Sequence, residues 1–229
     1  MGDSPRDSGP RRIDFHSHSY LTDGTTSATD MWYEAEILQH RALALTDHVG
    51  LEDPKPLLEQ LRREASGWDG SAFVPIVGVE LTKVPARRIA DAARACRKAG
   101  AEIVIVHGET PVENVPPGTN HAAIDSGAVD VLAHPGLLDP RDAELAKEHD
   151  VVLEISARVG HSLTNGHVAR VAIGAGAELV VDSDAHGPEQ LVPLEQARRI
   201  ARGAGLAGDR VEQALFTTPA ALVRRLRGR

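Results

Sequence analysis

The chain has 229 residues, of which 41% are hydrophobic, 25% charged and 3% aromatic, and its formal net charge is −8. This composition excludes the disordered and collagen-like classes, and the length suffices for one large domain with a substantial core. The apolar runs are much shorter than the roughly 20 residues of a membrane helix, so we expect no membrane span. The acidic balance also argues against a stable complex with nucleic acid, which favours a basic protein surface.

The amino-terminal segment and the single cysteine indicate the compartment. The first residues are polar and rich in Gly and Pro, and they lack the apolar segment of a secretory signal. We expect a disordered arm over residues 1–11 and one domain over residues 12–229. Cys96 cannot form an internal disulfide and lies in a helical pattern, where a small buried apolar residue is expected. These features favour a cytoplasmic protein.

A recurring unit of apolar run, polar turn and helical stretch organises the chain. The seven apolar runs cover residues 12–15, 42–46, 73–80, 102–106, 129–133, 151–155 and 178–182. Most are continuous, which is typical of parallel strands covered on both faces. Helical patterns include a helix capped by Ser27, a helix from Pro85 to Gly100, and residues 55–65, 140–149, 165–175, 189–203 and 209–226. This alternation predicts right-handed crossovers and a parallel sheet, either open or closed into a barrel.

Side chains that can bind a metal or transfer a proton follow every predicted strand. In chain order they are His16 and His18, Asp47 and His48, Glu80, His107 and Glu109, His134, Glu154, and Asp184 and His186. Taken singly, each is explained as an ordinary surface or capping residue, but their coincidence at all the strand ends predicts a metal centre. The carboxyl ends of barrel strands converge on one mouth, whereas an open sheet spreads them along a line. The pattern therefore favours a barrel.

The donor types limit the metals. Imidazoles and carboxylates without a cluster of thiolates suit Zn, Mn or Fe rather than Ca. The candidate ligands also outnumber those that one ion can bind. We therefore expect more than one divalent ion.

The strand-end motifs resemble those of the PHP (polymerase and histidinol phosphatase) family. The resemblance follows the family's order through DFHSHS (14–19), TDG (22–24), TDH (46–48), GVE (78–80), VHGE (106–109), AHPG (133–136), EIS (154–156) and DSDAH (182–186). It implies an α/β fold, a distorted (β/α)7 TIM-like barrel, with two to three divalent ions and phosphoesterase activity. Residues 112–120 and 157–167 are similar to those of stand-alone, histidinol phosphatase-like members.

The resemblance also implies how the ligands divide among the ions. Glu80 would lie between the first two sites, and some members have a His near the position of Asp23. The implied sets are His16, His18, Glu80 and Asp184 for one ion, Glu80, His107 and His134 for a second, and Asp23, His48 and His186 for a third.

The implied reaction is hydrolysis of a phosphate ester by a water that bridges two ions. Asp184 and His186 are predicted to combine ligation with orientation, so that their loss abolishes turnover. Glu109 and Glu154 are candidates for orienting imidazoles or for transferring a proton. The substrate would be a small phosphorylated molecule, nucleotides included.

Three further side chains are candidates for substrate binding. Arg158 and His161 follow the sixth predicted strand, and Lys83 follows the third. Arginine suits bidentate recognition of phosphate, although ordinary surface charge explains each of the three equally simply. Asn165 is a candidate N-cap for the next helix.

Two other functions stay open at this point. An amidohydrolase-type C–N hydrolase also begins with an HxH strand, but it typically bridges two metals with a carboxylated Lys on the fourth strand, where this chain has His107. A non-catalytic barrel that binds RNA or protein would be expected to lose metal ligands, which this chain retains.

Overall fold

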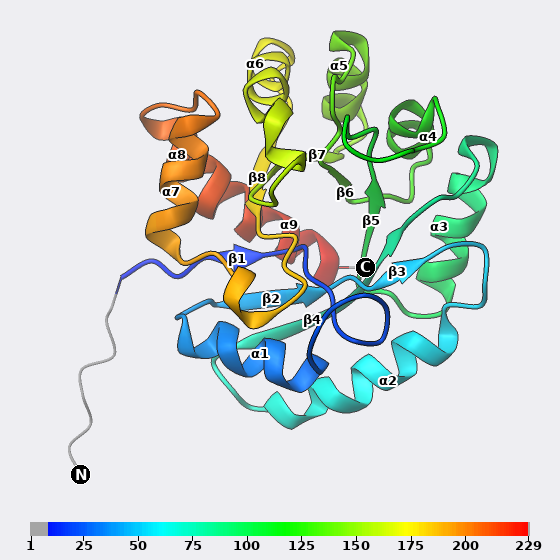
Figure 1. Ribbon diagram of the computed structural model, residues 1–229, viewed down its shortest axis with the longest axis vertical. Helices are drawn as coiled ribbons and strands as arrows, with labels where there is room; N and C mark the ends of the chain where they lie inside the picture. Colours follow the sequence, from blue (N-terminus) through cyan, green and yellow to red (C-terminus); the bar gives the residue numbers. More distant parts are fainter. Residues whose placement is uncertain (1–8, 229) are drawn as a thin grey trace.

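Residues 9–228 of the chain are described by the computed structural model, and they form a nearly closed parallel β-barrel surrounded by helices (Figure 1). The strands are β1 (Ile13–Asp14), β2 (Ala42–Leu45), β3 (His48–Val49), β4 (Val74–Leu81), β5 (Ile103–His107), β6 (Val131–Ala133), β7 (Val152–Ser156) and β8 (Leu179–Asp182). Their order is β1-β2-β4-β5-β6-β7-β8, and β3 adds a second short pairing to β4. All pairings are parallel. The predicted (β/α)7 barrel is confirmed, and β3 is an unpredicted addition.

The barrel closes between its first and last strands through isolated contacts. Ser17, just after β1, forms a single parallel bridge with Ala185, just after β8. The Asp14 carboxylate accepts hydrogen bonds from the main-chain amide of Ser183, at 3.1 Å, and from its hydroxyl. Closure brings the carboxyl ends of all the strands to one mouth.

The helices are α1 (Ala28–Ile37), α2 (Lys55–Ala65), α3 (Ile89–Lys98), α4 (Thr119–Asp125), α5 (Pro140–Glu148), α6 (Asn165–Ala175), α7 (Leu194–Gly203), α8 (Asp209–Glu212) and α9 (Thr218–Arg227). The predicted cap of α1 is confirmed, because the Ser27 side chain accepts a hydrogen bond from the Asp30 amide. Three predicted helices begin later or are interrupted: 3-10 turns precede α3 and α7, and a π-helical turn separates α8 from α9. Helix α4 was not predicted.

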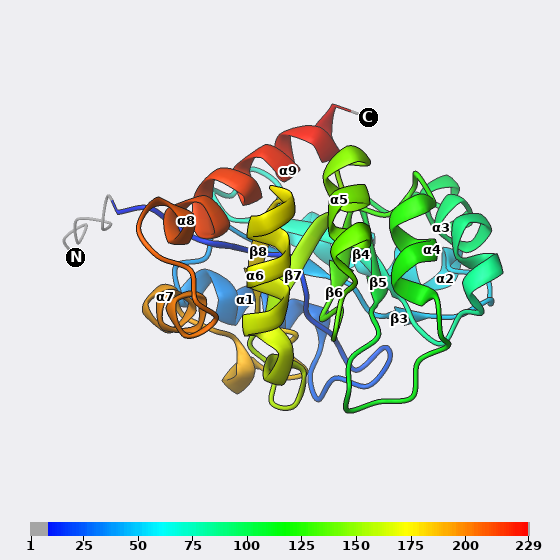
Figure 2. The same ribbon diagram turned by 90° about the horizontal axis from the view of Figure 1, so that it is seen from above.

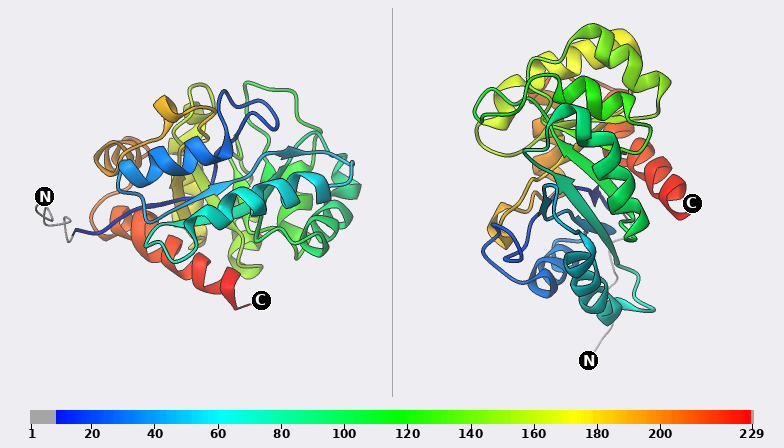
Figure 3. Two further views of the ribbon diagram at one scale, coloured as in Figure 1. Left: turned by 90° about the horizontal axis from the view of Figure 1, so that it is seen from below. Right: turned by 90° about the vertical axis from the view of Figure 1, so that its right-hand side faces the viewer.

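Two layers of apolar side chains hold the barrel. Inside it, a small cluster that includes Phe15, Ile76, Ile105 and Val180 fills the space between the strands. A larger cluster, which includes the buried Cys96, lies between the sheet and the surrounding helices. Helix α9 lies across the end of the barrel opposite the loops that follow the strands (Figures 2 and 3). One end of the barrel is therefore covered, and the other remains accessible.

The predicted disordered arm falls largely outside the described residues, which begin at Gly9. Within its last three residues, the Arg11 guanidinium donates hydrogen bonds to the carbonyl oxygens of Gln39, at 3.3 Å, and His40, at 2.6 Å. This end of the segment is thus fixed to the turn before β2. None of the helices in the described part of the chain has the length and apolar character needed to cross a membrane.

Candidate metal centre

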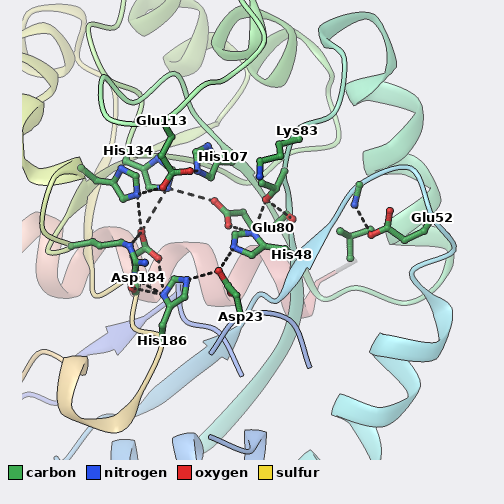
Figure 4. A pocket seen from close by; sticks show the side chains of 15 residues that line it. Asp23, His48, Glu52, Glu80, Lys83, His107, Glu113, His134, Asp184 and His186 are labelled. Atoms are coloured by element: carbon green, nitrogen blue, oxygen red, sulfur yellow. Dashed lines mark hydrogen bonds and ion pairs between the residues drawn. The ribbon is translucent and has the colours of Figure 1, made fainter. Parts of the chain in front are cut away.

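A cavity of about 360 Å³ lies at the mouth of the barrel (Figure 4). Its lining is rich in ionisable side chains: Asp23, His48, Glu52, Glu80, Lys83, His107, Glu113, His134, Arg158, His161, Asp184 and His186. They come from β3, β4 and β5 and from the loops that follow β1, β3, β4, β5, β6, β7 and β8. The structure thus brings together most of the site residues that the sequence suggested.

The first predicted set lies around two buried carboxylates. Residues two apart on an extended chain share one face, so His16 and His18 both point toward the barrel axis. Their Nε2 atoms lie 3.5 and 3.6 Å from the Glu80 carboxylate. The same two atoms lie 3.7 and 3.4 Å from Oδ1 of Asp184. These four side chains surround a common point with their donor atoms.

The second predicted set adjoins the first through Glu80. Nε2 of His134 lies 3.5 Å from Oε1 of Glu80, and the rings of His107 and His134 are 4.4 Å apart between centroids. A third imidazole belongs to the same cluster. The donor atoms of His107, His134 and His161 all lie within 4.8 Å of one another.

The third predicted set lies on the solvent side of His18. Oδ2 of Asp23 is 3.2 Å from Nε2 of His48 and 3.2 Å from Nε2 of His186. His18 completes a group of four whose donor atoms lie within 4.8 Å of one another. The Asp23 carboxylate therefore occupies the place that the sequence suggested for it.

Several buried donor atoms of the first two sets lack a hydrogen-bond partner among the described residues. They are Nε2 of His16, both ring nitrogens of His18, Nδ1 of His134 and Oε1 of Glu80. An unpaired buried polar atom is costly, by about 1–3 kcal/mol, and so is rare in folded proteins. Divalent cations would satisfy these lone pairs. The clustered imidazole and carboxylate donors thus fit a centre of two or more divalent ions.

Other ring nitrogens are anchored from behind, as is usual for metal-binding histidines. Nδ1 of His16 lies 2.7 Å from Oε1 of Glu154. Nδ1 of His48 contacts both the Thr82 hydroxyl, at 2.6 Å, and Oε2 of Glu80, at 2.8 Å. Glu154 also accepts a hydrogen bond of 2.7 Å from the main-chain amide of His134. The position of Glu154 therefore matches the predicted role of orienting imidazoles.

The clustered carboxylates and imidazoles shift one another's pKa values. Burial alone would raise the pKa of Asp184, but His16 and its neighbours hold it well below its usual range. Burial lowers the pKa of His18 to about 4, whereas Glu80 and Asp23 overcome burial and raise that of His48 to about 10. Without metal, protonated imidazoles supply the countercharge to the carboxylates. Divalent cations can take over this role.

Backbone strain is concentrated around the cavity. His134, Asp184 and Lys83 have φ angles of 25°, 51° and 57°, although L side chains other than Asn and Asp rarely adopt positive values. Such conformations cost about 1–3 kcal/mol each and persist where surrounding contacts impose them, often at functional sites. The strain aims the His134 and Asp184 side chains into the cluster.

A family model for the PHP domain matches residues 14–201. The chain belongs to the PHP domain family. An uncharacterized protein of Methanocaldococcus jannaschii is 41% identical over 219 residues, which cover 94% of this chain and all of that protein. A protein of Shewanella frigidimarina named "probable phosphatase" is 31% identical over 140 residues, 53% of this chain and 54% of its own length.

Solved structures also resemble this PHP chain in fold. A protein of Listeria monocytogenes described as a histidinol phosphatase candidate has a TM-score of 0.57 at 11% identity, over 78% of this chain and 97% of its own. Ochratoxinase of A. niger has a TM-score of 0.63 at 12% identity, over 93% and 71% of the two chains. Together, family membership and the donor set support a metal-dependent hydrolase.

The structure does not bring Glu109 to the centre of this PHP site. Its carboxylate accepts a hydrogen bond of 2.9 Å from the main-chain amide of Asn120, whose side chain accepts one of 2.9 Å from the Glu109 amide. This reciprocal pair fixes the first turn of α4, and Glu109 does not line the cavity. The geometry therefore gives no support to the predicted proton transfer by Glu109.

The predicted N-cap role of Asn165 is wrong. Thr164 occupies the N-cap position, and Asn165 is the first residue of α6. The Asn165 side chain instead accepts a hydrogen bond of 3.1 Å from the amide of Ser156 and donates one of 2.8 Å to its carbonyl oxygen. It ties α6 to the end of β7, which sequence spacing alone did not reveal.

The three predicted substrate-binding residues occupy different environments. Lys83 lines the cavity, and the Arg158 guanidinium lies 2.6 Å from Nδ1 of His186 and 3.1 Å from the carbonyl oxygen of Asp184. His161 is buried beside the other histidines, and burial together with His134 lowers its pKa to about 3. Sequence reasoning missed Glu113, because an acidic residue in a loop with several prolines looks like ordinary surface charge.

Proposed function

We propose that this PHP protein is a phosphoesterase that hydrolyses small phosphorylated molecules, nucleotides included. One observation carries the proposal. Three groups of imidazole and carboxylate donors adjoin one another at a single open cavity, with Glu80 and Asp184 shared between groups. A phosphoryl group presents several anionic oxygens, and such a row of cation sites can bind them together.

The chain's own residues divide the remaining tasks. Bound divalent ions would neutralise the phosphoryl charge and lower the pKa of water. Arg158 presents a planar guanidinium at the cavity beside Asp184 and His186, where it can bind a phosphate oxygen. Lys83, at the opposite side of the lining, offers a second positive charge to the substrate. Glu154 holds His16 in the orientation that directs its Nε2 inward.

The donor set favours phosphoester over C–N bond hydrolysis. Amidohydrolase-type sites typically carry a carboxylated Lys where β5 ends, and this chain has His107 there. The carboxylate shared between groups comes instead from Glu80 on β4. Resemblance to amidohydrolase structures at 13% identity concerns the fold alone.

The proposal is tested by metal analysis of protein purified without chelator, paired with hydrolysis assays. Phosphomonoesters, phosphodiesters, nucleotides and small amides are assayed with Mn, Zn and Fe. We expect two to three ions per chain, and turnover of a phosphoester that falls at least about 100-fold in His107→Ala and Asp184→Asn. Glu109→Gln, which removes a carboxylate from outside the cavity, serves as the control and should keep most of the activity.

Two outcomes would reject the proposal. Fewer than one ion per chain, with no hydrolysis after metal loading, would indicate a binding module instead. Preferential hydrolysis of amides would indicate a C–N hydrolase. RNA binding that weakens steeply with salt would support the binding module, because it reports release of counterions from phosphates.

A further inference from the structure

The loop between β5 and α4 places a carboxylate over the second histidine group. Glu113 is half-exposed, and its Oε2 lies 3.3 Å from Nε2 of His107 while its Oε1 lies 3.5 Å from Nε2 of His161. In Figure 4 the side chain points down from its loop toward His107 and His134. The carboxylate thus covers the solvent side of the group, facing donor nitrogens from two different strand ends.

His161 has the features of a ligand in this group. Its side chain is 3% exposed, and its ring stacks on that of His134 with centroids 4.0 Å apart. Its Nδ1 lies 2.7 Å from the Thr110 hydroxyl, which leaves Nε2 directed at Glu113 and Asp184. This is the arrangement already seen for His16, where Nδ1 is held by Glu154 and Nε2 faces the centre.

The loop that carries Glu113 has few other attachments. In the part of the chain that the structure describes, the main chain of residues 111–115 makes no hydrogen bond to another strand or helix. Pro111 begins this stretch, and the Pro116–Pro117 pair follows it, ahead of Gly118 with a φ of 82°. The contacts of Glu113 with the two histidines are therefore the main polar restraint on the position of the loop.

We propose that Glu113 and His161 join Glu80, His107 and His134 at the site of the second divalent ion, and that Glu113 is the exchangeable ligand. Imidazole nitrogens and carboxylate oxygens are both ligands that zinc binds in proteins. The three imidazoles are buried, on the end of β5, just after β6 and on the 3-10 turn before α6, whereas the carboxylate lies on a loop at the cavity surface. A phosphoryl oxygen of the substrate would replace the Glu113 carboxylate, a step that rests on the proposed phosphoesterase function.

The test counts ions rather than turnovers. Metal-free wild type, Glu113→Gln and His161→Gln are titrated with zinc against a competing chelator, and bound zinc per chain is measured. We expect each variant to bind one ion about 10- to 100-fold more weakly while the affinity for the other ions stays unchanged. Glu52→Gln is the matched control, because Glu52 also lines the cavity but its carboxylate accepts a hydrogen bond from the Gly50 amide.

A second measurement tests the exchange. At saturating zinc, inorganic phosphate should bind Glu113→Gln about tenfold more tightly than wild type, because no carboxylate competes for the ion. Unchanged zinc affinity in Glu113→Gln, whose substitution lies on a surface loop and should not unfold the barrel, would overturn the assignment of Glu113 as a ligand. Unchanged phosphate affinity would overturn the exchange. If zinc binding responds as expected but wild type hydrolyses no phosphoester, the site stands and the proposed function fails.

Discussion

At the scale of single residues, Glu80 connects the parts of the metal centre. One of its carboxylate oxygens faces Nε2 of His16 and of His134, both at 3.5 Å, and the other faces His18 at 3.6 Å. It is fully buried, and its histidine neighbours overcome the effect of burial and hold its pKa well below the usual range. The sequence alone marked Glu80 as an ordinary strand-end carboxylate, and the family resemblance was needed to suggest that it is shared.

Replacing this shared carboxylate should affect two ions at once. Glu80→Gln removes one negative charge and one oxygen donor. In zinc titrations against a chelator, we therefore expect two ions per chain to bind more weakly than in wild type. Glu154→Gln, which acts through the ring of His16 and the main chain of His134, should weaken zinc binding by about 10- to 100-fold. Loss of one ion or none in Glu80→Gln would show that the carboxylate is not shared.

His40 gives a residue-scale prediction away from the metal centre. It is fully buried before β2, and neither ring nitrogen has a hydrogen-bond partner among the described residues. Burial, with help from Arg12 and Arg11 and against the opposing charge of Asp14, lowers its pKa from 6.5 to about 4. Between about pH 4 and 6.5, the unfolded chain therefore binds a proton at His40, whereas the folded chain does not.

It follows that wild type should lose stability as the pH falls from 7 toward 4. His40 alone accounts for about 3 kcal/mol of this loss, since each pKa unit corresponds to about 1.4 kcal/mol. His40→Leu replaces the imidazole with an apolar side chain of similar size that cannot bind a proton. This variant should therefore lose that part of the pH dependence. Urea unfolding of both metal-free proteins at several pH values measures the difference. Parallel stability curves for the two proteins would contradict the assignment.

At the scale of elements, the strand ends were predictable and the loops between them were not. Continuous runs of Val, Ile and Leu identify strands covered on both faces, which is why β2, β5 and β7 appear close to their expected positions. Helix α4 has only 7 residues, too few for a clear apolar period, and its start is fixed by the Glu109–Asn120 pair. The position of Glu113 depends on that loop, so no pattern in the sequence pointed to it.

A glycine in one of these loops provides an element-scale prediction. Gly136 follows His134 with a φ of 67°, and a Cβ there would overlap the carbonyl oxygen of Glu109. Gly127 has a similar φ of 64°, but no atom lies within 4 Å of an added Cβ. Gly127→Ala should therefore cost about 1 kcal/mol of unfolding free energy from backbone strain alone.

Gly136→Ala adds a steric clash to the same strain, so its cost should exceed about 2 kcal/mol. Because the clash displaces the chain beside His134, this variant should also bind zinc more weakly at the neighbouring site. Urea unfolding without metal gives the first quantity, and zinc titration gives the second. Equal stability losses in the two variants, with unchanged zinc binding, would show that the loop accommodates the added methyl group.

At the scale of the whole molecule, closure of the barrel places the site. The seven strands and their order follow from the sequence, but the joint between β1 and β8 depends on buried polar side chains far apart in the chain. Asp182 accepts a hydrogen bond of 2.9 Å from the Phe15 amide, and the Arg12 guanidinium donates one of 2.9 Å to the carbonyl oxygen of Val181. Such contacts cannot be paired from the sequence, because a charged side chain near a strand end has many available partners.

Burying the unpaired donor atoms at the mouth of the barrel lowers the stability of the metal-free protein. Because bound cations would pair with these atoms, metal binding should stabilise the folded chain. An ion that binds the folded chain alone stabilises it by about 2.7 kcal/mol at 100 times its dissociation constant. For a chain of this size, each kcal/mol raises the unfolding midpoint by about 2–4 °C, so zinc should raise it by about 5–10 °C. Thermal unfolding with and without chelator measures this shift. Asp184→Asn should lose most of it, because Asp184 contacts His16, His18 and His134.

Ser27→Ala separates this coupling from general stability. It removes the cap of α1, and it should lower the unfolding free energy by about 1 kcal/mol whether or not zinc is present. A zinc-dependent shift that is retained in Ser27→Ala but lost in Asp184→Asn would place the coupling at the mouth of the barrel. If zinc and chelator leave the wild-type midpoint unchanged, the buried donors are satisfied in some other way, and the metal centre itself is contradicted.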